Sequence, residues 1–133
     1  MSNKRMMIIL KKLTPLGLIL ASALIVNCGY VATNLYGASS LITVIFIPSA
    51  IVVYLGWYLR NLKRTMAYTF SFTLLSAVLT QITLSAPVLL NIIENVYYKN
   101  LFTYTVFLRV IQYFCVTTFF SLITALIAGL AFE

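Results

Sequence analysis

Long uncharged, apolar stretches dominate the hydrophobic pattern of this chain. No charged residue occurs at positions 13–59, between Lys12 and Arg60, or at positions 65–93, between Arg64 and Glu94. A helix that crosses a bilayer needs about 20 predominantly apolar residues. The first stretch is therefore long enough for two spans, and the second for one.

Turn-forming and charged residues divide the apolar pattern into four predicted spans. Thr14-Pro15 is typical of a helix start, and the turn formers at 34–40 separate the first span from the second. The predicted spans are about 13–33, 41–59, 65–93 and 101–131, and together they make one membrane domain, 13–133, after a basic arm, 1–12. The pattern therefore predicts an all-α integral membrane protein with four transmembrane helices in an up-down bundle.

The distribution of cations predicts the orientation of this bundle. Four spans place both termini on one side, together with seven of the nine Lys and Arg residues. By the positive-inside rule this side faces the cytoplasm, or the equivalent compartment of an organelle. The expected location is the plasma membrane or an organelle inner membrane. Anionic lipid head groups then account for the net charge of +7 without a nucleic-acid partner. The predicted head-group contacts are Lys11, Lys12, Arg60, Lys63 and Arg64.

The composition argues against catalysis and metal binding. Hydrophobic residues make up 62% of the chain and charged residues 8%, and the sequence holds neither His nor Asp. Without imidazole the chain alone cannot build a bis-His haem site, a His-based zinc or copper site, or a Ser-His-Asp triad. We therefore expect no enzyme activity, no cofactor and no metal.

The two cysteines, Cys28 and Cys115, fall at similar predicted depths in the first and fourth spans. A disulfide would form only if these spans are neighbours. The favoured interpretation is two unrelated buried thiols, because free Cys is among the most buried residue types. No Cys-x-x-Cys motif is present, which argues against a thiol oxidoreductase.

The third and fourth spans each carry small, mostly polar residues at alternating spacings of three and four. Such stripes let helices approach closely and hydrogen-bond across the contact. We predict that the two stripes form a helix-packing seam, facing each other or a partner protein. The second span carries mostly Ile, Val, Phe and Leu, and is expected to be the most exposed to lipid. The seam residues are Thr69, Thr73, Ser76, Thr80, Thr83 and Asn91 in the third span, and Thr117, Ser121, Thr124 and Ala128 in the fourth.

Pro48 and Pro87 interrupt the second and third predicted spans. Each proline frees the carbonyl four residues before it, at Val44 and Thr83, so both helices are expected to kink. In the favoured interpretation, nearby Ser and Thr hydroxyls satisfy these carbonyls. In the alternative, the carbonyls face a substrate or ion, as in transporters with broken helices.

Glu94 and Arg109 are the candidate functional charges near the membrane. If the fourth span is helical from Leu101, Arg109 is buried roughly 12 Å from the outer end of the span. At that depth Arg109 could pair with Glu94 or bind an anionic ligand. The favoured alternative places residues 101–108 in the interface and Arg109 at head-group level, with a span of 110–131.

These features favour a non-catalytic accessory or structural subunit of a larger membrane protein complex. Its expected partners are other membrane protein subunits and anionic lipids. The alternative function is a small four-helix transporter or channel that acts as a homo-oligomer. It would require the small-polar stripes to line a water-filled cavity rather than to pack against protein.

Overall fold

The computed structural model describes residues 2–37 and 41–133, and all regular secondary structure in these residues is helical. Four of its helical segments are long and apolar enough to cross a membrane, which confirms the predicted all-α, four-span class. The elements are α1 (Ser2–Tyr36), a π-helical segment η1 (Leu41–Phe46), α2 (Ile47–Leu59), α3 (Leu62–Leu84), the short α4 (Ala86–Leu89) and α5 (Val96–Phe132).

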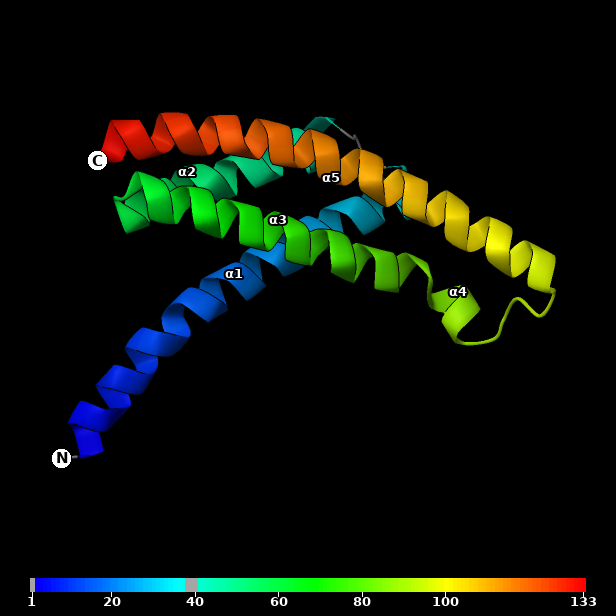
Figure 1. Ribbon diagram of the computed structural model, residues 1–133, viewed down its shortest axis with the longest axis horizontal. Coiled ribbons are helices and arrows are strands. Elements are labelled where there is room, and N and C mark those ends of the chain that lie inside the picture. Colours follow the sequence, from blue (N-terminus) through cyan, green and yellow to red (C-terminus); the bar gives the residue numbers. More distant parts are fainter. Residues whose placement is uncertain (1, 38–40) are drawn as a thin grey trace.

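The four long helices alternate in direction (Figure 1). Both termini and the turn between α2 and α3 lie at one end of the bundle, which we call the termini end, whereas α4 lies at the opposite, hairpin end (Figure 1). The most extensive contacts join α3 to α5, α1 to α3 and α2 to α5. The first half of α1 diverges from the other helices, so only its second half belongs to the packed bundle (Figure 1).

The third helix is shorter than predicted. The sequence pattern indicates a span over 65–93, but α3 ends at Leu84 and α4 covers only Ala86–Leu89. Pro87 has no amide hydrogen with which to continue the ladder, and Asn91 adopts a left-handed backbone with φ of 56°. The polar and aromatic hairpin therefore begins after Leu89, about one helical turn earlier than the charge at Glu94 indicates.

The remaining helix ends also differ from the predicted boundaries. The predicted arm, 1–12, continues without a break into α1. Asn61 and Asn95 cap α3 and α5, because their side-chain oxygens accept hydrogen bonds from the backbone N–H of Arg64 at 3.1 Å and of Tyr97 at 2.9 Å. The helix α5 thus begins at Val96 rather than 101. Part of the predicted 34–40 connection, residues 38–40, lies outside the described residues.

A side-chain hydroxyl compensates for Pro48. The carbonyl of Val44, which Pro48 leaves without its helical donor, accepts a hydrogen bond of 3.0 Å from Thr117 Oγ1 on α5. Thr117 in turn accepts a hydrogen bond from the hydroxyl of Tyr30 on α1. This confirms the hydroxyl interpretation for the proline of the second span, and it ties three segments together at one buried point.

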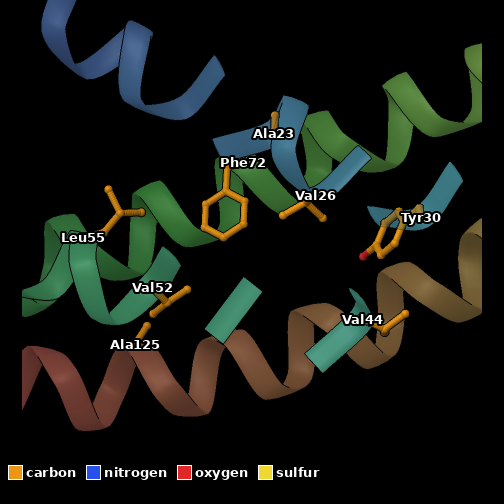
Figure 2. Close-up of a cluster of buried hydrophobic side chains, with 8 residues drawn as sticks. All are labelled: Ala23, Val26, Tyr30, Val44, Val52, Leu55, Phe72 and Ala125. Carbon is orange, nitrogen blue, oxygen red and sulfur yellow. The ribbon is translucent and has the colours of Figure 1, made fainter. Parts of the chain in front are cut away.

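Buried apolar side chains from α1, η1, α2, α3 and α5 meet beside this polar contact (Figure 2). Tyr30 and Phe72 are the largest of them, and both are fully buried. The ring of Tyr30 also stacks on that of Tyr113, with centroids 5.4 Å apart. The cluster comprises Ala23, Val26, Tyr30, Val44, Val52, Leu55, Phe72 and Ala125.

The expectation that the second span is the most exposed to lipid is wrong. One third (33%) of the residues in Ile42–Leu59 are buried inside the protein. In the most apolar 18-residue stretch of α1, and in that of α5, 28% of the residues are buried. The buried face of α2 includes Val52, Leu55 and Gly56. Large apolar residues are therefore a poor guide to lipid contact here, because α2 uses them for the bundle core.

The two cysteines do not form a disulfide. Both Cys28 and Cys115 are free thiols, and both are exposed at the surface of the protein. The prediction of two unrelated thiols agrees with this finding, whereas the prediction that they are buried inside the protein is wrong. In a membrane-spanning helix an exposed Cys side chain can face lipid at little cost, because it behaves as a small hydrophobe.

Replacing Gly56 by Leu should destabilise the bundle. A Cβ atom at Gly56 would lie only 2.8 Å from Cβ of Ala128 on α5, so α2 and α5 would have to separate. We expect a loss of about 1–3 kcal/mol, the usual cost of overpacking. The matched control is Gly17→Leu, since no atom lies within 4 Å of a Cβ at that position. Thermal unfolding in detergent checks both variants, and equal melting temperatures would contradict the α2–α5 contact.

Candidate functional site

The polar stripe of α3 is buried within the chain itself. Thr69, Thr73, Ser76 and Thr80 are each at most 1% exposed. Thr83 and Asn91, also predicted for the seam, are exposed at the hairpin end. Thr65, which sequence reasoning missed, continues the buried face one turn toward the termini end, four residues before Thr69.

The hydroxyls of this stripe are satisfied inside α3. Thr69, Thr73, Ser76 and Thr80 each donate to a backbone carbonyl three or four residues earlier, at 2.7–3.0 Å. The side chains therefore present compact surfaces rather than free donors to their neighbours. Thr80 alone also reaches another helix: its hydroxyl hydrogen is shared between the Ser76 carbonyl and Asn27 Oδ1 of α1, each 2.8 Å from its oxygen.

The stripe of α5 contacts η1 and α2. Thr117 donates to the Val44 carbonyl, and Thr124 lies 3.5 Å from Ser49, measured between the hydroxyl oxygens. Ala128 lies against Gly56. Ser121 is also fully buried, and its hydroxyl has no hydrogen-bond partner among the described residues.

Arg109 pairs with an amide rather than with Glu94. Its Nη1 donates to Asn34 Oδ1 at 3.3 Å, and the Asn34 side chain donates in turn to the Tyr30 carbonyl at 2.9 Å. Glu94 is exposed in the hairpin, and no ion pair joins it to Arg109 in the described parts of the chain. Sequence reasoning missed Asn34 as the partner because Asn34 lies 75 residues before Arg109 in the chain, and local spacing cannot predict such a contact.

A cavity of about 620 Å³ opens beside Arg109 at the hairpin end. The end of α1, the α3–α4 junction and the first half of α5 enclose it, with Asn34, Pro87 and Phe102 among its lining residues. Most of the lining is apolar, and Arg109 is the one charged residue in it. Such a cavity can hold an anion or a polar head group, but its lining offers no acid, base or nucleophile beyond two Thr hydroxyls.

The predicted head-group residues lie at the termini end. Lys11, Lys12, Arg60, Lys63 and Arg64 are all exposed. Arg60 caps α2 in a left-handed conformation with φ of 48°, which turns the chain into α3. No group of three metal-ligating His, Cys, Asp or Glu side chains occurs in the part of the chain that the structure describes.

Replacing Thr117 by Val should destabilise the protein more than a similar change elsewhere in α5. The variant leaves the Val44 carbonyl without its donor and removes an acceptor from the Tyr30 hydroxyl. We expect a loss of about 1–3 kcal/mol, the cost of an unpaired buried polar group. The control is Thr105→Val, because Thr105 is exposed and bonds only within its own helix. Unfolding in mixed micelles measures both, and a Thr117→Val variant as stable as the control would contradict the network.

Comparison with known proteins yields no match among protein-family models, curated proteins or solved structures. The function of this chain is therefore inferred from its own residues and contacts.

Proposed function

We propose that this protein is a non-catalytic subunit of a larger membrane protein complex, and that it attaches to its partner through the hairpin end. The observation that carries the proposal is the difference in length between α3 and α5. The exposed apolar surface on the extra length of α5 and on the hairpin before it has no covering element in the described chain.

The helix α5 is much longer than a bilayer requires. The 23 residues of α3 extend about 35 Å, close to the roughly 30 Å hydrocarbon core of a bilayer. The 37 residues of α5 extend about 55 Å. α3 begins and α5 finishes at the termini end. The extra length of α5 therefore continues past the last residue of α3 at the hairpin end (Figure 1).

This projecting part, residues 89–104, carries large apolar side chains that the chain leaves exposed. Leu90, Val96 and Tyr97 are each 70% exposed, and Ile92 and Tyr104 are 69% and 61% exposed. Apolar surface outside the hydrocarbon core costs about 25 cal/mol per Å² unless another surface covers it. Contiguous patches of this kind are typical of protein interaction sites.

The packing inside the bundle supports a structural role over a transport role. The central residues of the α3 stripe are buried in contacts within the protein. A channel or transporter built on this stripe would need the same residues to line a water-filled cavity. The cavity beside Arg109 includes only Thr83 of that stripe.

The proposed orientation has the termini end in the cytoplasm or the equivalent organelle compartment. Seven of the nine Lys and Arg residues belong to the first turns of α1 and to the α2–α3 turn, and the positive-inside rule assigns them to that side. The projecting hairpin end then meets its partner on the opposite side of the membrane.

Photo-crosslinking in the native membrane tests the proposed attachment. A photoreactive amino acid replaces Tyr104 in the projecting part, and the control carries it at Tyr54, an exposed position on α2. We expect the Tyr104 position to link to one membrane protein, which also co-purifies at fixed stoichiometry in native mass spectrometry after mild extraction. The Tyr54 position should give mainly lipid adducts.

Two results would contradict the proposal. The first is a protein that purifies from its native membrane only as a monomer or homo-oligomer. The second is a Tyr104 position that links only to lipid or to a second copy of this chain.

A further inference from the structure

The cavity beside Arg109 combines a mostly apolar wall with one cation. Its volume of about 620 Å³ falls in the range that is usual for small-molecule sites, roughly 300–1,000 Å³. Three segments that are distant in the sequence enclose it: the end of α1, the α3–α4 junction and α5. Its apolar lining residues are Leu35, Leu84, Ala86, Pro87, Phe102 and Val106. An occupant therefore needs an apolar part that fits against these walls.

Arg109 supplies most of the free hydrogen-bond donors of the cavity. Its guanidinium carries five N–H groups, and within the described residues it makes one hydrogen bond, to Asn34 Oδ1 at 3.3 Å. The hydroxyls of Thr83 and Thr105 already donate to carbonyls of their own helices, at 2.8 Å and 2.9 Å. No carboxylate of the described chain pairs with Arg109. Because hydrogen bonds between a guanidinium and an anionic oxygen are among the strongest, a carboxylate or phosphate group fits this position.

The cation lies at the inner end of the cavity, and the apolar walls continue from it toward the hairpin end. The Asn34 amide, which holds the guanidinium, is bonded to the Tyr30 carbonyl, one turn of α1 closer to the termini end. Phe102 comes two helical turns before Arg109, so its backbone lies about 10 Å nearer the hairpin end. Pro87 lines the cavity from α4, also at the hairpin end (Figure 1). The occupant therefore has its anionic group innermost and its apolar part toward the hairpin end.

This order of polarity is opposite to that of a bilayer phospholipid. The stretch of α5 from Arg109 to Phe132 extends about 35 Å, as α3 does, and the hydrocarbon core is roughly 30 Å thick. Arg109 therefore lies at the edge of the core on the hairpin side, and the apolar walls of the cavity lie farther out. A phospholipid at this level has its head group outward and its chains inward. A free amphipathic anion can enter the cavity in the required orientation.

We propose that this cavity is a binding site for a small amphipathic anion, a carboxylate or phosphate group on an apolar chain or ring. The anionic oxygens bind to Arg109, and the apolar part lies against Pro87 and Phe102. An acidic side chain from a partner protein would fill only part of this volume. Phe102 is the one lining residue that belongs to the projecting part, 89–104, so the site is distinct from the proposed attachment surface and does not rest on it.

Photolabelling of the full chain in phosphatidylcholine nanodiscs tests the site and the orientation of its occupant. The probe is octanoate that carries a diazirine at the far end of its chain. It should label the peptides that contain Pro87 and Phe102, and unlabelled octanoate should compete with it. Labelling confined to residues 110–131 of α5 would overturn the proposal, because the chain would then point into the bilayer.

Competition on the unmodified protein separates the two parts of the ligand. Octanol lacks the anionic group and acetate lacks the chain, so neither should displace the probe at concentrations at which octanoate does. Octanol, acetate or inorganic phosphate as effective as octanoate would overturn the proposal, because one part of the ligand would then be sufficient. Phosphatidylglycerol as effective as octanoate would also overturn it, because a bilayer lipid would then be the occupant.

Two pairs of variants locate the site. Arg109→Gln should weaken probe binding by at least about tenfold, as expected when a hydrogen bond between charged groups is lost. Lys99→Gln removes the same charge at the same end of the bundle, but Lys99 does not line the cavity, so binding should be unchanged. Ala86→Trp should block the cavity, whereas Leu89→Trp, at an exposed position of α4 outside the lining, should not. Equal effects within either pair would overturn the proposal.

Discussion

A polar group within the membrane is costly unless it finds a partner inside the protein, and this constraint organises most of the buried contacts of the bundle. On α3 the hydroxyls of Thr69, Thr73 and Ser76 donate to their own helix, which leaves a compact face for close packing. Where Pro48 breaks the helical ladder, a hydroxyl from another helix replaces the missing donor. The buried contacts of the bundle therefore combine small polar residues with a limited apolar core.

Two of the surfaces that this packing leaves uncovered lie at the ends of the bundle. At the termini end, the first half of α1 diverges from the other helices and its four cations are exposed. At the hairpin end, α5 projects past α3 with exposed aromatic and aliphatic side chains. The proposed attachment to a partner uses the hairpin end, and the helices between the two ends pack against one another.

The sequence predicts what depends on local chemistry. Charge-free stretches reveal the four spans, and spacings of three and four locate the buried core of the α3 stripe. The end of α3 at Leu84 depends on how Pro87 and Asn91 fold together, which span length alone does not indicate. The partners of Arg109 and of the α5 stripe lie more than 70 residues away in the chain, so only the packed structure identifies them.

The central claim, that the small-polar helices pack within one chain, can be tested most directly at the contact between α1 and α3. Asn27 and Thr80 are joined by a side-chain hydrogen bond of 2.8 Å, and both can be replaced by Cys after Cys28 and Cys115 are changed to Ser. Mild oxidation in the membrane should link the two new cysteines within a single chain. Disulfides that form only between two copies of the chain would contradict the account.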